Sequence, residues 1–429
     1  MFLNQLTLFT LASLATSSGS VLLVDAASGP YFDIQSAVDA SSAGDVVLVR
    51  SGNYPAFAVV ARSLAVAADT GANVYVQGAI RARNVGVGQT LVVSGLRAQD
   101  TLSVTTETNG FRATDCPGSI RVQDCELFGG NGALCVPPPP EGMPAGARIR
   151  SSSDVLIGRS LLVGGMLPGG YYDPPTPRSG SGVDVESSRV ALHQVVARGP
   201  DGSTGCPDGS SGGNGATLLP GSEFHAQFCQ FEGGRGGSSQ PAPAGFGGNG
   251  GSGLLLDWAC PNPSLARTLS CSFVPGLGGF GSCSIFCGGE NFDGAPGSAT
   301  YFGPCGTIVP LTGVAPTIEF PAVARESTTV TVGLTGAALD RVWLRISRAT
   351  GHEWVPSQNG VRFVGNGFAA WLLVAELDLT GQASYNLPIQ ALSVGEQSRI
   401  YHLQVLAQRP NGTLQLGSAR SLIVVDSAI

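Results

Sequence analysis

The sequence predicts an all-β protein in which a parallel β-solenoid with three short strands per coil precedes a β-sandwich. Three observations lead to this prediction. A repeat runs through the middle of the chain, aligned positions of the repeat are wholly apolar, and the composition changes near residue 310. A chain of 429 residues is also longer than one hydrophobic core usually serves, so two domains are expected.

The repeat consists of five segments that begin with glycine and alternate with period two. Their starts are separated by 36, 36, 33 and 38 residues, and further apolar segments follow in each copy. Because alternate side chains of a strand point to opposite faces, the apolar positions must share a core. Copies stacked about 4.8 Å apart form a parallel solenoid. The five segments begin at Gly110, Gly146, Gly182, Gly215 and Gly253.

The N-terminal part fits the start of such a solenoid. Residues 31–43 place apolar side chains at the spacing of an amphipathic helix, which would cover the first coil. This segment, with residues 44–54 after it, resembles the N-terminal cap and first rung of the pectin-lyase-like right-handed β-helix superfamily. The resemblance implies a right-handed parallel β-helix with a capping helix over residues 21–305. It implies no activity, since that superfamily includes lyases, hydrolases, esterases and non-enzymatic surface proteins.

The first twenty residues predict export. The apolar stretch Leu6–Ala15 is followed by small residues, as in a signal peptide that covers residues 1–20. The stretch is too short for a membrane span, and no later run of about 18 apolar residues occurs. Ten cysteines in an exported chain indicate disulfides. For the inward-facing cysteines, buried thiols and a Cys229–Cys271 bridge are the alternatives. We expect a secreted, cell-surface or periplasmic protein with no membrane span after signal cleavage.

The charge of the chain excludes one class of partner. The formal net charge is −7, and all 23 basic residues are arginine. Binding of nucleic acid requires a basic face that contacts phosphates. No nucleic acid is therefore expected among the partners.

Residues 310–429 predict a second domain. Cysteine ends at Cys305, glycine becomes less frequent, and turn residues separate alternating apolar runs at regular spacing. This pattern is typical of a β-sandwich. Anchoring, sorting and glycan binding are candidate roles for it, and a cap on the open C-terminal end of the solenoid is a further one.

The resemblance places a substrate cleft beside the first strand of each coil, where long loops form the walls and outward side chains form the floor. Arg148 and Arg150 lie on this floor, and Asp184 and Glu186 occupy the same positions one repeat later. A lyase that acts on acidic sugars needs carboxylates for Ca²⁺ and a base such as arginine, so these four are candidate catalytic residues. The alternative is cross-strand ion pairing on a solvated sheet. Candidate binding residues are Arg112 and Asp257 on the floor and Tyr171 and Tyr172 in a loop.

Few residues have the arrangement of metal ligands. Asp201, Asp208 and Asp293 in the glycine-rich loops are candidates for Ca²⁺, but they do not form the nonapeptide calcium repeat, and solvated loop residues are the alternative. No other cofactor is expected. His193 and His225 fall at outward positions of the second strand of a coil and are expected to be surface residues.

The motifs of known catalytic β-helix proteins are absent. The sequence contains no Asp-Asp pair, no Gly-His-Gly and no Arg-x-Pro-x-x-Arg. We therefore expect an exported, non-enzymatic β-helix repeat protein that presents Gly/Pro-rich loops for surface binding or structural roles, with a polysaccharide or cell-surface glycan as the candidate partner. The alternative function is a polysaccharide lyase or hydrolase that acts on acidic glycans in the cleft.

Overall fold

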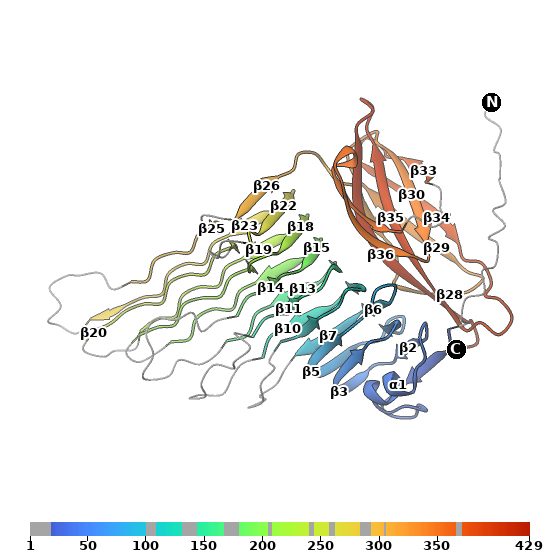
Figure 1. Ribbon diagram of the computed structural model, residues 1–429, viewed down its shortest axis with the longest axis horizontal. Coiled ribbons are helices and arrows are strands. Elements are labelled where there is room, and N and C mark those ends of the chain that lie inside the picture. Colours follow the sequence, from blue (N-terminus) through green and yellow to red (C-terminus); the bar gives the residue numbers. More distant parts are fainter. Residues whose placement is uncertain are drawn as a thin grey trace.

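The computed structural model of the chain is nearly all β (Figure 1). Two large sheets of parallel strands form a nearly closed, β-helix-like body, and smaller sheets follow at the C-terminal end of the chain. In the part of the chain that is described, no helix has the length and apolar character needed to cross a membrane. The structure describes residues 19–99, 109–130, 144–166, 180–204, 208–239, 244–256, 262–283, 293–303, 306–365 and 371–429.

One sheet of the body has ten strands, and every neighbouring pair is parallel. In spatial order its strands are β1 (Val21–Val24), β2 (Val46–Val49), β4 (Leu64–Ala68), β6 (Thr90–Ser94), β9 (Ser119–Gln123), β12 (Asp154–Gly158), β15 (Arg189–His193), β18 (Glu223–Gln227), β22 (Leu265–Leu269) and β26 (Thr307–Pro310).

The other sheet has fourteen strands in two arms that meet at β5 (Val74–Arg83). The first half of β5 pairs with one arm and the second half with the other, and β3 (Gly52–Val60) pairs along both halves. One arm contains β7 (Leu96–Gln99), β10 (Glu126–Phe128), β13 (Leu161–Val163), β16 (Val196–Arg198), β19 (Gln230–Glu232) and β23 (Ser272–Val274). The other contains β8 (Phe111–Thr114), β11 (Ala147–Arg150), β14 (Val183–Glu186), β17 (Ala216–Leu218), β21 (Leu254–Leu256) and β25 (Thr300–Phe302).

The strand register reproduces the apolar columns of the sequence repeat. Ala147 pairs with Phe111 on one side and with Val183 on the other, and all three side chains are fully buried. They belong to one continuous cluster that runs from the first strand of the body to its last coils. The body is therefore held together by burial of the same positions in every repeat.

A short helix, α1 (Ile34–Ala40), lies beside the first strands, as the periodicity of the sequence predicts. Asp33 caps its N-terminus by accepting a 2.7 Å hydrogen bond from the backbone N–H of Ser36. Ile34 and Val38 are buried in the core of the body.

The C-terminal part, which we call the two-sheet domain, has its own core between a three-stranded and a five-stranded sheet. The three-stranded sheet contains β27 (Thr317–Glu319), β29 (Thr329–Thr335) and β34 (Gln382–Pro388). The five-stranded sheet contains β28 (Val323–Arg325), β36 (Leu414–Val425), β35 (Ser398–Gln408), β30 (Arg341–Ser347) and β33 (Leu372–Glu376). A two-stranded sheet of β31 (Thr350–Val355) and β32 (Gly360–Val364), joined by the 3-10 helix η1 (Pro356–Gln358), completes the domain.

The two-sheet domain lies against the outer face of the ten-stranded sheet, not over the C-terminal end of the body (Figure 1). Val46 and Leu48 point outward from β2 and pack with Ile423 of β36, while Val47 of the same strand faces the inner core. Both faces of these strands are thus buried, which explains their unbroken apolar sequence. The expected role as a cap on the open end is wrong, because the domain covers a side.

The same contact overturns the expectation that His193 and His225 are surface residues. Both do point outward from the ten-stranded sheet, but both are buried. His193 packs edge-on against Phe363, and His225 stacks on Trp354 of the two-sheet domain. The sequence predicts correctly that both side chains point outward, but it does not predict that the two-sheet domain covers them.

Candidate functional site

The four candidate catalytic residues meet on the outer face of the arm that contains β11 and β14. Arg148 lies beside Asp184, and Arg150 lies beside Glu186. The guanidinium of Arg148 is 2.8 Å from the carboxylate of Asp184, and that of Arg150 is 2.5 Å from Glu186. The structure therefore contains the two cross-strand ion pairs of the alternative interpretation.

This ion pairing limits the chemistry of the site. Each of the two arginines donates to a carboxylate of the neighbouring strand, so all four charged groups are engaged in ion pairs. Among the residues that the structure describes, no group of three or more His, Cys, Asp or Glu side chains is placed to hold a metal ion.

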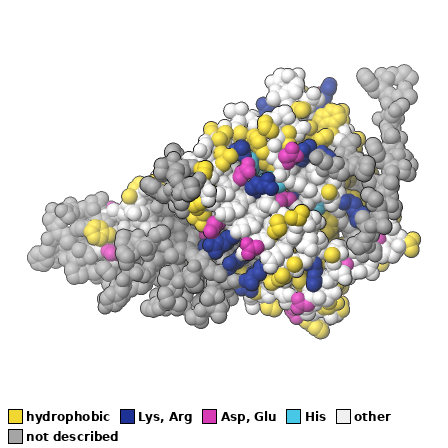
Figure 2. Space-filling model, in the orientation of Figure 1, with side chains coloured by type: hydrophobic (Ala, Val, Ile, Leu, Met, Phe, Trp, Pro, Cys, Tyr) yellow, Lys and Arg dark blue, Asp and Glu magenta, His cyan; other side chains and the backbone are white. Residues whose placement is uncertain are grey.

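The face around the pairs is rich in arginine. Arg81 of β5 pairs in register with Arg112, which pairs with Arg148, and Arg83 and Arg150 lie two residues further along the same strands. Farther along the column the residues become neutral or apolar, beginning with Thr217 and Leu255. Figure 2 shows basic and acidic side chains next to one another near the middle of the molecule. Tyr171, Tyr172 and Asp257, the other candidate binding residues, lie outside the described residues.

The glycine-rich segments between the coils form an ordered unit, which we call the glycine bundle. Three segments lead away from the body and three lead back, and Figure 1 shows them as long, nearly parallel traces. The outgoing segments are 199–203, 233–239 and 274–281, and the returning ones are 208–213, 244–251 and 293–297. Val274, at the start of one outgoing segment, is the last residue of β23, and β20 (Ala244–Gly245) in a returning segment pairs with β24 (Ser282–Cys283) just beyond the bundle.

Backbone hydrogen bonds join these segments at every third residue. Gly234 and Gly237 each donate a 2.8 Å hydrogen bond to a returning segment, at the carbonyl oxygens of Gly213 and Ser210. Outgoing segments also bond one another, as Gly202 does to the carbonyl oxygen of Arg235 at 2.6 Å. A period of three is that of the polyproline II helix, which has no hydrogen bonds within itself. Likewise, the glycine segments satisfy their donors through their neighbours.

Glycine is required in the bundle because neighbouring segments approach one another closely. A Cβ placed on Gly251 would lie 1.8 Å from the carbonyl oxygen of Gly213, and one on Gly276 would lie 1.9 Å from that of Gly234. None of these four glycines has a positive φ. Their role is therefore the one that glycine has in collagen, where only a hydrogen atom fits between chains.

The three aspartates considered as Ca²⁺ ligands are distributed over this bundle. Asp201 accepts a 2.7 Å hydrogen bond from the backbone N–H of Arg235, and Asp208 accepts one of 2.8 Å from that of Phe246. Asp293 accepts one of 2.8 Å from Gly281. Each carboxylate holds the N–H of an adjacent segment, and the fold does not bring the three together.

Residues at the third positions point out of the bundle, and several are apolar. Phe246 is 57% exposed, Leu277 is 67% exposed and Phe280 is 61% exposed. The guanidinium of Arg235 lies over the ring of Phe280, 4.9 Å from its centre. The glycine-rich composition predicts loops for these segments, although the motif Gly-Gly-x-Gly-Gly-x at residues 233–238 and 247–252 has the period of three.

The last layer of the bundle has proline at two donor positions. The backbone N–H of Gly199 donates to the carbonyl oxygen of Glu232, and one coil later the N–H of Gly233 donates to that of Val274 at 2.8 Å. In the coil after that, the equivalent position is Pro275, which has no N–H to donate. Pro296 follows Gly250 in the same way on the returning side, since Gly250 donates to Ala295. Proline at these positions removes donors that would otherwise attract another chain.

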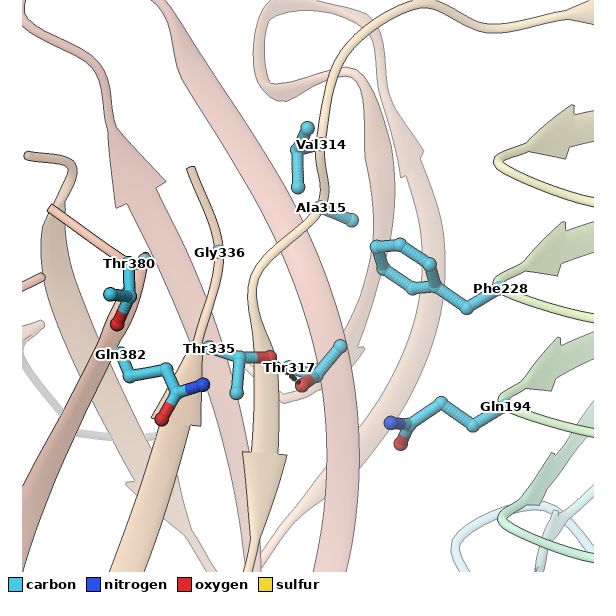
Figure 3. A pocket seen from close by; sticks show the side chains of 10 residues that line it. Gln194, Phe228, Val314, Ala315, Thr317, Thr335, Gly336, Thr380 and Gln382 are labelled. Carbon is cyan, nitrogen blue, oxygen red and sulfur yellow. Dashed lines mark hydrogen bonds between the residues drawn. The ribbon is translucent and has the colours of Figure 1, made fainter. Parts of the chain in front are cut away.

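Two cavities lie between the body and the two-sheet domain. The first, about 380 Å³, is lined on one side by Gln194 and Phe228, which point from the corners of the body (Figure 3). Thr317 and Thr335, joined by a 2.5 Å hydrogen bond, line the other side. The second, about 600 Å³, contains charged residues that pair with one another, Arg420 with Asp124 and Arg159 with Glu319.

The described cysteines are free thiols. Cys116, Cys125, Cys229 and Cys271 form no disulfide, so the Cys229–Cys271 bridge is absent from the structure. Burial raises the pKa of Cys125 to about 12, and burial also raises the pKa of Cys229 well above its ordinary value. Cys125 and Cys229 are therefore small core residues with little reactivity. Cys271 differs, because a side-chain hydrogen bond with Cys229 lowers its pKa and it is only partly buried.

Comparisons with known proteins identify no family. No family model and no curated protein matches the chain. Among solved structures, a superoxide reductase (neelaredoxin) from Ignicoccus hospitalis is 11% identical and has a TM-score of 0.16, covering 26% of this chain and 80% of its own. The PKD domain of an M14-like peptidase from a Thermoplasmatales archaeon is 14% identical with a TM-score of 0.17, covering 27% and 96%. The Siphovirus 9NA tailspike receptor binding domain is 10% identical with a TM-score of 0.15, covering 91% and 97%. Likeness at this level supports no inference about function.

Proposed function

We propose that the chain is an exported, non-catalytic binding protein that presents the glycine bundle to carbohydrate. In this proposal the body is a right-handed parallel β-helix of the pectin-lyase-like kind, with three strands per coil and α1 as its N-terminal cap. The two-sheet domain is a β-sandwich. The observation that carries the proposal is the bundle itself, a hydrogen-bonded backbone with exposed aromatic rings at its third positions.

The bundle supports binding because its backbone is ordered before a ligand arrives. Backbone N–H groups at every third residue donate to neighbouring segments, so Phe246 and Phe280 project from a backbone that is fixed by hydrogen bonds. Preorganisation of this kind lowers the entropy lost on binding. Exposed rings on a rigid surface are suited to stack on the C–H faces of sugar rings, and exposed apolar groups of this size mark interaction sites.

The ion pairs favour binding over catalysis. Asp184 and Glu186 are each engaged by an arginine, and no described group of ligands is placed for a metal ion. The excess of arginine on this face does favour a second candidate function, a lyase or hydrolase acting on acidic glycans. A screen of the purified protein against uronate polymers with and without Ca²⁺, read by absorbance of the unsaturated product, distinguishes the two.

The binding proposal is tested by affinity electrophoresis through gels that contain neutral or acidic polysaccharides. We expect wild-type protein to be retarded by at least one polymer, and a variant with both Phe246→Ala and Phe280→Ala to bind at least tenfold more weakly. Phe32→Ala is the matched control, because Phe32 is 62% exposed at the opposite end of the body. Failure of the wild type to bind any polymer, or equal binding by the double variant, would refute the proposal.

Export is tested separately. If residues 1–20 are a signal peptide, protein recovered from the medium, cell surface or periplasm of a host should begin near residue 21 by mass spectrometry. Recovery of the full-length chain from the cytoplasm alone would contradict this part of the proposal.

A further inference from the structure

All four histidines of the chain lie between the body and the two-sheet domain. His193 of β15 and His225 of β18 come from the body, and His352 of β31 and His402 of β35 come from the two-sheet domain. All four side chains are buried. The rings of His225 and His352 are 6.1 Å apart across the contact. The only side chains that change charge between pH 5 and 8 without a perturbed pKa are thus gathered at one interface.

His193 is held in its neutral form by its contact across the interface. The backbone N–H of Ala419 in the two-sheet domain donates a 3.3 Å hydrogen bond to its Nδ1, which must therefore carry a lone pair. Phe363 covers the ring edge-on. Burial, together with the proximity of His225 and His352, lowers the pKa of His193 to about 3.

His402 is similarly enclosed on the two-sheet side. Its Nδ1 lies 2.9 Å from the hydroxyl of Ser421 on the neighbouring strand. Burial and the charge of Arg121, opposed by Asp154, lower its pKa to about 3, and both of these residues belong to the body. Protonation of His402 would place a cation in a site that is closed to water.

The charged groups around His225 and His352 are already paired. His225 Nε2 lies 3.2 Å from both Glu223 and Arg267, and Arg267 is bound to Glu223 at 2.6 Å. Burial lowers the pKa of His225, although Glu223 opposes the shift. His352 Nδ1 lies 3.4 Å from Asp154, which forms a 2.7 Å ion pair with Arg121.

We propose that mild acid releases the two-sheet domain from the ten-stranded sheet by protonating the histidines at their contact. Because the folded-state pKa values of His193 and His402 are lowered, their contribution to the contact is complete above pH 6.5 and is lost as the pH falls toward 3. The two parts keep their folds, since each has its own core and the contact between them consists of smaller shared clusters and polar contacts.

Two carboxylates at the contact have lowered pKa values. A side-chain hydrogen bond with His225 lowers the pKa of Glu223 to about 2, and Arg121 and His352 lower the pKa of Asp154 in spite of its burial. Asp124 pairs with Arg420, and Asp69 pairs with Arg325 at 3.0 Å, across the same interface. Changes between pH 7.5 and 5 therefore report on the histidines. The pKa values of His193 and His402 fall from 6.5 to about 3 when the contact forms. At pH 5 each histidine therefore raises the equilibrium constant for separation roughly 30-fold above its value at neutral pH, and the two together raise it about 1,000-fold.

The experiment measures the radius of gyration of the full chain by small-angle X-ray scattering from pH 7.5 to 5, together with tryptophan fluorescence, since Trp354 stacks on His225. We expect expansion and a fluorescence change in the wild type, and neither in a variant with His193→Asn and His402→Asn, because asparagine can accept a hydrogen bond but does not protonate. Asp124→Asn is the control, and it should loosen the contact without changing its pH dependence over this range.

Two results would overturn the proposal. One is a wild-type radius of gyration that is equal at pH 7.5 and 5. The other is a double asparagine variant that expands over the same range as the wild type. If that variant does not fold, NMR titration of the wild-type histidines decides, because four histidines that titrate near pH 6.5 while the chain stays compact would also refute it.

Discussion

Substitution of Gly251 by alanine tests whether the glycine segments pack as the structure shows. An open loop and a packed glycine bundle predict opposite signs for the change in the free energy of unfolding. Gly251 does not have a positive φ, so in an open loop an alanine would be tolerated and would stabilise the chain by about 0.4–1 kcal/mol through the unfolded state. In the glycine bundle the new Cβ lies 1.8 Å from the carbonyl oxygen of Gly213, and the two segments must separate.

The magnitude follows from the hydrogen bonds that would be lost. The segments that must separate are joined by two hydrogen bonds, from Gly212 to Asn249 at 2.8 Å and from Gly209 to Phe246 at 2.9 Å. Loss of two such bonds, at about 0.5–1.5 kcal/mol each, destabilises the protein by about 1–3 kcal/mol. The assay is urea unfolding of Gly251→Ala beside Ser252→Ala, because the neighbouring position already carries a Cβ. The reasoning is refuted if Gly251→Ala is as stable as the Ser252 control or more stable than the wild type.

Three further predictions concern the candidate site, the thiols and the edge of the bundle. Removal of Arg148 alone leaves the largely buried Asp184 carboxylate unpaired and should cost about 3 kcal/mol in urea unfolding, whereas Arg148→Met with Asp184→Leu should recover most of it; equal stability of the two variants would contradict an ion pair. Because burial raises the pKa of Cys125 to about 12 and that of Cys229 well above its ordinary value, a thiol reagent at pH 8 should label both only after unfolding, and rapid labelling of native protein would contradict their placement. Pro275→Gly restores a backbone donor at the outer edge of the bundle and should promote self-association in light scattering, while a strictly monomeric variant would show that proline does not protect this edge.

The β-helix-like body was the part most open to prediction from sequence. Phe111, Ala147 and Val183 align in the repeat and pair in the structure, because strand alternation converts a column of apolar residues directly into one side of a core. The meeting of Arg148 with Asp184 follows from the same register.

Two features were not predicted, for identifiable reasons. The position of the two-sheet domain depends on apolar residues such as Leu156 and Ala191 that point outward from the body. An unbroken apolar strand indicates that both of its faces are buried, but the strand does not show what covers the outer face. Here the covering element is the two-sheet domain, which lies far along the sequence. The glycine bundle was missed because its signal has period three, whereas helices and strands have periods of 3.6 and two.

Hydrogen exchange of the bundle amides tests the central claim most directly. The N–H groups of Gly234, Gly237, Gly251 and Gly276 each donate to a neighbouring segment. The account predicts that they exchange at least a hundredfold more slowly than unstructured glycine amides at the same pH. Exchange at the unstructured rate would show that the glycine segments are open loops, and it would remove the basis for the proposed binding platform.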